Sequence, residues 1–377
     1  MAQNLSDDSP RATVSRPRID GVDAARALAV FGMFTVHLGV ASIGLLPEDG
    51  ATALHTLVRG NSSALFALLA GLSLAFMTGR GDAPAVRIIT RAVVIGLLGV
   101  FLDLMSVPVA IILTYYAGFF LLALPFARLR AGALWAVAGV LAVAGPAVSF
   151  ALRSAMGVPE PRLSSLGSVT EFFLTGYYPA ITFMAFVYAG MAVGRMDLTA
   201  TAVRLRLLAL GAGLSVFAYG GSWLLLTSVD PALRAGIENE MYSVSGQVPT
   251  DSWWWLAVGT PHTGTTFEIA QAVGQALIVL VACVWLAERA RWLMYPLSSV
   301  GRMPLTVYSG HLFAIAVVMG LSTQGWRSPW LLEGFVLGAI GFAVLWRVAV
   351  GRGPLESLLG AIADGVTATV EEARARN

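Results

Sequence analysis

Long apolar stretches separated by short polar connections repeat along almost the whole chain. Each is long enough to cross about 30 Å of hydrocarbon as a helix. They cover residues 22–46, 60–78, 88–106, 109–127, 132–151, 177–194, 205–228, 264–287, 303–321 and 330–350. No soluble domain, P-loop or internal repeat interrupts the series. We therefore predict an all-α integral membrane protein, a single bundle of about ten transmembrane helices.

The polar ends of the chain divide it into three parts. Residues 1–19 form a tail that we expect to be disordered, residues 20–360 the transmembrane domain, and residues 361–377 a second tail. Nothing before Ile19 resembles the core of a signal peptide, so the first apolar stretch is expected to be an uncleaved helix. Most arginines fall on one side of the bundle when the N-terminus is cytoplasmic. We expect both tails to be cytoplasmic and the protein to be multi-pass in the cell inner (plasma) membrane.

Composition agrees with this class and excludes several kinds of site. The chain is 57% hydrophobic and only 12% charged, whereas soluble domains carry about 25% charged residues. Its single cysteine, Cys283, excludes an internal disulfide and a thiolate metal site. The four histidines lack the spacing of a zinc site. We therefore expect no metal, and a net charge of +2 does not indicate a nucleic-acid partner.

Ionisable residues on the first apolar stretch are the strongest functional signal. A charge at bilayer depth costs several kcal/mol by most scales, so Asp23, Arg26 and His37 require an explanation. On a helix Arg26 and His37 share one face about 16 Å apart, with Arg26 near a membrane surface and His37 near mid-depth. This pattern suits a long ligand with an anionic head. Asp23 can pair with Arg26 as a purely structural alternative, and a neutral His37 needs a hydrogen-bond partner.

The remaining candidates lie farther along the chain. His262 precedes the stretch 264–287, where Thr265 and Glu268 have the spacing of a helix-capping box. His55 lies between the first two apolar stretches, and His311 is near mid-depth of 303–321. The candidate catalytic residues are therefore His37, His262, His55, His311 and Glu268. The structural alternatives are a buried hydrogen-bonded histidine, a surface histidine for His55 and a capping role for Glu268.

Four arginines are candidates for binding an anionic ligand at the cytoplasmic rim. Guanidinium groups match the geometry of phosphate oxygens. The residues are Arg26, Arg87, Arg91 and Arg302. The alternative is that these arginines set the membrane topology and contact anionic lipid.

Several of these segments together resemble the transmembrane acyltransferase superfamily. DGVDAARALAVFGMFTVHL is similar to its first helix, and Arg26 and His37 match the arginine–ten residues–histidine motif of enzymes that O-acylate sugars. LFALLAGLSLAF resembles its second helix. PHTGTTFEI, VGRMPLTVY and WRVAVGRGPLESLL are similar to bacterial relatives of heparan-α-glucosaminide N-acetyltransferase. The resemblance extends from residue 20 to about residue 360.

The resemblance implies acyl transfer, most simply of acetyl, from cytoplasmic acyl-CoA to an extracytoplasmic acceptor such as a glycan, an amino sugar or a lipid-linked acceptor. Acyl-CoA would be a co-substrate rather than a tightly bound cofactor. Many members of the second branch carry a different polar residue in place of His37, so the base stays open among His37, His55 and His262.

Two other classes compete with an enzyme. A proton-coupled transporter or flippase also has many helices with buried titratable residues, although no matching halves are found here. A non-catalytic protein that binds lipid or organises a complex would not require His37 at mid-depth. The lipid bilayer is a partner in every case, and a homodimer is an assembly open to such a bundle.

Overall fold

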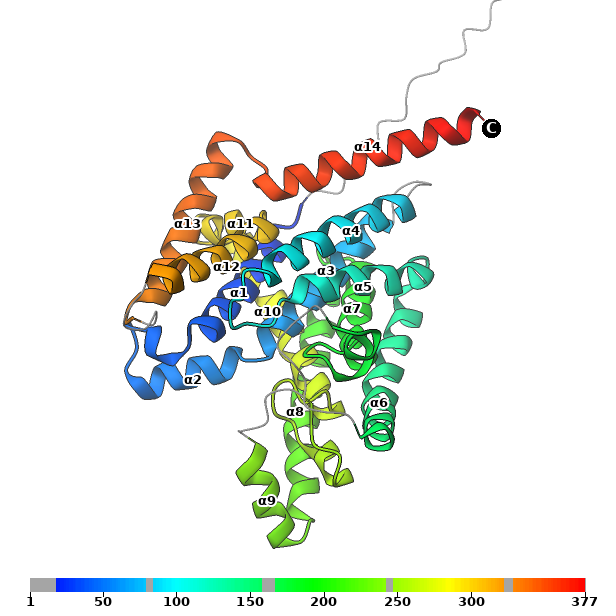
Figure 1. Cartoon of the computed structure of the whole chain (residues 1–377), viewed down its shortest axis with the longest axis vertical. Helices are drawn as coiled ribbons and strands as arrows, with labels where there is room; N and C mark the ends of the chain where they lie inside the picture. The colour runs from blue at the N-terminus through cyan, green and yellow to red at the C-terminus, as the bar shows by residue number, and fades with distance from the viewer. Residues whose placement is uncertain (1–17, 79–83, 158–166, 242–246, 322–327, 377) are drawn as a thin grey trace, which may run out of the picture.

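The computed structural model describes residues 18–78, 84–157, 167–241, 247–321 and 328–376. Throughout these residues the regular structure is helical. Most of the predicted N-terminal tail lies outside the described residues. The helices form a bundle with α1 near its middle (Figure 1).

Each predicted apolar stretch corresponds to one helix. These helices are α1 (Asp20–Leu38), α3 (Asn61–Thr78), α4 (Pro84–Asp103), α5 (Ile112–Ala123), α6 (Ala131–Met156), α7 (Ala180–Gly194), α8 (Thr201–Thr227), α10 (Thr266–Arg289), α12 (Pro304–Leu321) and α13 (Leu331–Ala349). In the described part of the chain, 8 helical segments are long and apolar enough to cross a membrane, and Ile112–Phe126 and Ala180–Gly194 are shorter apolar helices. The prediction of a multi-pass helical membrane protein is confirmed, with two of the ten segments shorter than a regular span.

The first predicted stretch is too long. α1 ends at Leu38, because Gly39 adopts φ 79° and ψ 168° and leaves the helix. The chain then turns into α2 (Glu48–Val58), a short helix that leads directly into α3. The end of α2 and the start of α3 thereby come beside the end of α1.

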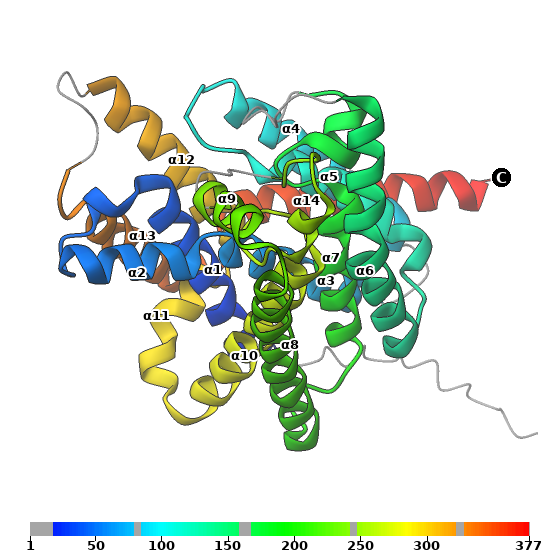
Figure 2. The same ribbon diagram turned by 90° about the horizontal axis from the view of Figure 1, so that it is seen from below.

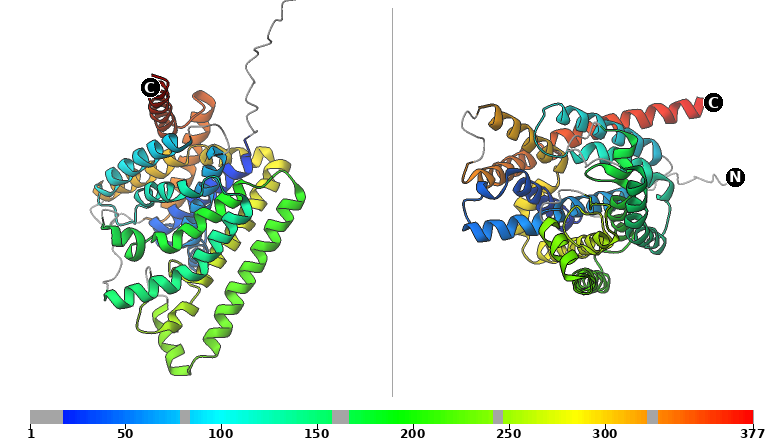
Figure 3. Two further views of the ribbon diagram at one scale, coloured as in Figure 1. Left: turned by 90° about the vertical axis from the view of Figure 1, so that its right-hand side faces the viewer. Right: turned by 60° about the horizontal axis from the view of Figure 1, so that its bottom comes forward.

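Three further helices were not predicted. They are α9 (Pro231–Met241), α11 (Arg291–Gly301) and α14 (Pro354–Arg376). α14 packs against α4 and α12, runs through the predicted boundary at residue 360 and extends beyond the bundle (Figure 1). α8 forms a long outer edge of the bundle, and its partner there is α10 (Figure 3).

Close helix contacts place α1 in the interior. α1 packs against α11, α10 and α3, and Figure 2 shows it between α2 and α13 on one side and α3 on the other. A methyl group added at Gly301 would overlap the Asp23 carbonyl, so α11 approaches α1 at backbone distance. A methyl group at Gly71 would overlap the Val187 carbonyl in the same way, between α3 and α7. Small residues allow such contacts between membrane helices.

Candidate active site

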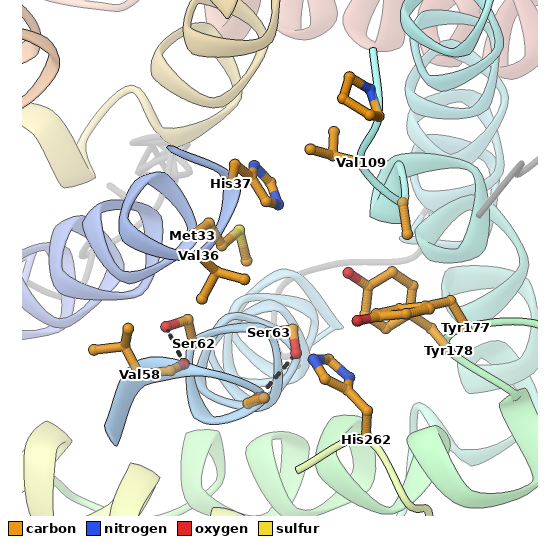
Figure 4. Close-up of a pocket in the computed structure, with 13 residues that line it drawn as sticks. Met33, Val36, His37, Val58, Ser62, Ser63, Val109, Tyr177, Tyr178 and His262 are labelled. Atoms are coloured by element: carbon orange, nitrogen blue, oxygen red, sulfur yellow. Dashed lines mark hydrogen bonds between the residues drawn. The ribbon is translucent and has the colours of Figure 1, made fainter. Parts of the chain in front are cut away.

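A cavity of about 160 Å³ opens beside the end of α1 (Figure 4). Five segments of the chain contribute to its wall: α1, the α2–α3 junction, the segment before α5, the segment before α7 and the loop before α10. The lining residues are Met33, Val36, His37, Val58, Gly60, Ser62, Ser63, Pro108, Val109, Ala110, Tyr177, Tyr178 and His262. Two of the predicted catalytic histidines therefore share one cavity.

His37 is in the last turn of α1, half-buried, with its ring directed at the cavity (Figure 4). Its Nδ1 lies 3.0 Å from Nε2 of His311 on α12. The two rings are nearly parallel, with centroids 5.2 Å apart and planes 14° apart. The hydrogen-bond partner that a histidine at this depth requires is thus a second histidine, while the His37 ring also forms part of the cavity wall.

His311 is buried behind His37 and is not among the described residues that line the cavity. Its ring packs against Phe34, at 4.6 Å between centroids, and against Tyr308, at 5.0 Å. These neighbours are aromatic, so the polar contact of His311 on the cavity side is its hydrogen bond to His37. His311 can therefore act on a ligand only through His37.

His262 is held on the cavity wall by an unusual backbone conformation. Its φ is +66°, in the left-handed region, which costs about 1 kcal/mol or more for a residue other than glycine. The imidazole lies 4.6 Å from the Tyr177 ring and 6.0 Å from the Tyr178 ring, centroid to centroid. Such strained residues concentrate at functional sites because the surrounding structure must maintain them.

The α10 N-terminus supplies the contacts that hold this loop. The Thr265 hydroxyl accepts the Glu268 backbone N–H at 3.1 Å, which confirms the predicted cap, and donates to the Val258 carbonyl at 2.5 Å. The buried Glu268 carboxylate accepts from the backbone N–H groups of His262 and Gly264. In the predicted capping box this carboxylate would instead accept the backbone N–H of the cap residue, Thr265, so the capping role predicted for Glu268 is wrong. Glu268 thus positions the His262 loop and is not among the described residues that line the cavity.

Burial determines the protonation states in this wall. Desolvation lowers the pKa of His262 from 6.5 to about 3, and Arg59 and His37 add to the effect. The imidazole is therefore neutral at neutral pH. Burial also raises the pKa of Tyr177 and of Tyr178, so both phenols stay protonated. The backbone N–H of Tyr177 donates to the Tyr115 hydroxyl of α5 at 3.2 Å, which fixes the aromatic pair.

At the start of α1, a buried ion cluster surrounds Asp23. Its side chain is 2% exposed, and its carboxylate pairs with Arg26, with Arg18 at 2.6 Å and with Arg302 at 3.7 Å. Arg302 also pairs with Asp20 at 3.0 Å. Three guanidinium groups thus face two carboxylates, and the cluster carries an excess of positive charge. The predicted Asp23–Arg26 pair is present.

Serine hydroxyls and a further arginine extend this cluster. Arg26 donates to the Ser73 hydroxyl of α3 at 3.1 Å. Arg347 of α13 donates to the hydroxyls of Ser298, at 2.9 Å, and Ser299, at 3.0 Å, and its guanidinium lies 4.2 Å from the Tyr295 ring centre. Cations and hydroxyl donors on four helices therefore gather at one end of α1.

The other two predicted rim arginines belong to a different group. Arg87 of α4 pairs with Asp364 of α14 at 2.7 Å, and both side chains are well exposed. Arg91, one turn farther along α4, contacts the Met77 sulfur at 3.3 Å and has Arg87, Asp364 and Arg352 as its charged neighbours. The structure thus divides the predicted rim into an Asp23 cluster and an α4–α14 cluster.

His55 lies on α2, half-buried and outside the set of described residues that line the cavity. No sequence pattern marked Ser62, Ser63 or Arg347 as site residues. Tyr177 and Tyr178 do line the cavity; in the sequence, aromatic residues before an apolar stretch are typical of a membrane interface. No local pattern distinguishes that role from a place in a cavity wall.

Two regions of the chain match known protein families. Residues 18–227 match the family described as heparan-alpha-glucosaminide N-acetyltransferase, catalytic. Residues 242–365 match a family described as protein of unknown function (DUF418). A search of curated proteins finds no match. The first match covers more than half of the chain and includes His37, while the second includes His262 and His311. The chain therefore belongs to the heparan-alpha-glucosaminide N-acetyltransferase catalytic family and is a transmembrane acyltransferase-like relative of that enzyme.

Proposed function

We propose that the protein transfers an acyl group, most simply acetyl, from cytoplasmic acyl-CoA to an amine or hydroxyl of an extracytoplasmic acceptor such as a glycan or amino sugar. One observation carries the proposal: His37 and His262, from the two separately matched regions, line a single cavity. A catalytic base needs access to its ligand, and both imidazoles have it. We place the protein in the plasma membrane with both termini cytoplasmic.

The donor would bind along α1. The Asp23 cluster is cationic and lies at the helix start, and guanidinium groups bind phosphate oxygens in a bidentate manner. Arg26 and His37 are about 16 Å apart along the helix axis. The pantetheine arm of CoA has a comparable length, so phosphates near Arg26 would bring the thioester close to His37. Arg302 and Arg347 would add contacts to the nucleotide phosphates.

The acceptor would occupy the cavity between His37 and His262. The cavity combines an aromatic wall, Tyr177 and Tyr178, with a few polar groups, the usual make-up of a site for a small ligand. Nε2 of His37 would take a proton from the acceptor amine or hydroxyl. At the same time the nitrogen or oxygen of the acceptor would attack the carbonyl carbon of the thioester. The carbon–sulfur bond then breaks, and the CoA thiolate receives the proton from His37. His262 would orient the acceptor from the opposite wall.

Purified protein in detergent tests this directly. We would measure acetyl-CoA binding and, with a panel of amino sugars and glycans, release of CoA. We expect wild type to bind acetyl-CoA and to release CoA, and R26A to bind acetyl-CoA more weakly. H37A should bind acetyl-CoA normally and release CoA at least 100-fold more slowly, in the usual range for loss of a general base. H55A, away from the cavity, is the matched control. Loss of turnover in H262A with H37A active would move the base to His262, and no binding of any acyl-CoA would refute the proposal.

A further inference from the structure

A histidine that cannot reach the cavity is hydrogen-bonded to one that can. His311 is 4% exposed, and its Nε2 is 3.0 Å from Nδ1 of His37. In a bond between two neutral imidazoles one nitrogen carries the proton and the other accepts it. Which of the two carries it decides whether Nε2 of His37, on the cavity side, is a base or a donor.

The surroundings of His311 select one arrangement. Its other nitrogen, Nδ1, is buried and has no hydrogen bond of regular geometry within the described residues. Its polar neighbours are the backbone carbonyls of Val307 and Tyr308, in the preceding turn of α12. A proton on Nδ1 faces these oxygens favourably, whereas a lone pair there would be repelled by them. His311 therefore carries its proton on Nδ1, and its Nε2 accepts.

We propose that His311 is a positioning residue that holds His37 in the Nδ1–H tautomer, with an unprotonated Nε2 directed at the cavity. His37 Nδ1 then donates to His311 Nε2. The near-parallel setting of the two rings, 14° apart, and the packing of Phe34 against His311 fix the orientation of the pair. This is the role that an orienting group has behind a catalytic histidine, although here the group is neutral.

The same bond would assist the reaction, a part of the inference that rests on the proposed function. When His37 Nε2 takes the acceptor proton, the imidazolium keeps its Nδ1–H bond to His311, and the new charge is stabilised by a lone pair already aimed at it. His311 gains and loses no proton in this step. It needs only an accepting atom at the position of Nε2.

The tautomer can be measured without any acyl-CoA. The chain has four histidines, so ¹⁵N-histidine NMR of the purified protein gives four ring systems, assigned with H55Q, H262Q and H311Q. We expect His37 protonated at Nδ1 in wild type and in H311Q, because the glutamine Oε1 can accept, and a change toward Nε2–H in H311M, which has no acceptor. His37 protonated at Nε2 in wild type, or unchanged in H311M, would overturn the inference.

Kinetics test the consequence. We expect H311M to lower kcat for acetyl transfer about 10- to 100-fold, the range found when the group that orients a metal-bound histidine is removed. The KM for acetyl-CoA should stay within about twofold, and H311Q should be close to wild type. S309A, which removes a buried hydroxyl on the same helix, is the matched control. Equal losses in H311Q and H311M would show a packing role instead. If wild type transfers no acetyl group, the proposed function fails while the NMR result stands by itself.

Discussion

Replacing Asp23 by asparagine tests the buried ion cluster at which we propose that the donor binds. The Asp23 side chain is 2% exposed and pairs with Arg26, whose side chain is 15% exposed. The other two partners, Arg18 and Arg302, are 51% and 29% exposed, so water can solvate them when the carboxylate is neutralised. Arg26 cannot be solvated to the same extent. D23N therefore leaves one uncompensated buried cation.

The expected loss in the free energy of unfolding follows from that single buried charge. Breaking a buried ion pair costs about 3–5 kcal/mol, and the two solvated partners favour the lower end, about 3 kcal/mol. With an unfolding entropy of about 2 cal/mol/K per residue, this corresponds to a Tm lower by about 4 °C for a chain of 377 residues. Thermal unfolding can be followed with a thiol-reactive dye. The single cysteine, Cys283, is buried in the folded protein and becomes reactive when the protein unfolds.

The matched control removes a carboxylate at the exposed pair. Arg87 and Asp364 are 42% and 55% exposed, so D364N is expected to change stability by less than about 0.5 kcal/mol. A double variant, D23N/R26M, is expected to recover part of the loss because it leaves no uncompensated buried charge. If D23N unfolds at the same temperature as D364N, the reasoning about the cluster is wrong.

Three other changes test the cavity and its loop. V36W places a bulky ring in a space of about 160 Å³, and we expect transfer to stop while calorimetry still detects acetyl-CoA binding. T265A removes the α10 cap and is expected to cost about 1–2 kcal/mol in denaturant unfolding, with T265S close to wild type. Because burial lowers the pKa of His262 to about 3, the unfolded chain takes up a proton that the folded chain does not as the pH falls below 6.5. The Tm of wild type is therefore expected to fall relative to that of H262Q between pH 7 and pH 4. A difference in Tm between the two proteins that does not change with pH would contradict this expectation.

Features that depend on local chemistry could be predicted from the sequence. In lipid the backbone N–H and C=O groups of a spanning segment must bond to one another, and the segment must be apolar along its whole length. Each apolar stretch therefore predicted a helix, and the structure contains a helix in each one. Helical geometry placed Arg26 and His37 on one face and Asp23 next to Arg26. The spacing of Thr265 and Glu268 predicted the α10 cap, since that interaction needs only neighbouring residues. The exact end of α1 depended on Gly39, an isolated glycine within an apolar run.

The site itself was decided by tertiary packing. His37 lies on α1, His262 in the loop that precedes α10, and His311 on α12. The sequence around each of them does not indicate that they approach one another. Their positions follow from close helix contacts such as that at Gly301. Such contacts depend on the shapes of whole helix faces, which local spacing does not specify. For this reason the sequence determined which residues could carry the chemistry, and only the structure separated the cavity-facing His37 and His262 from the buried His311.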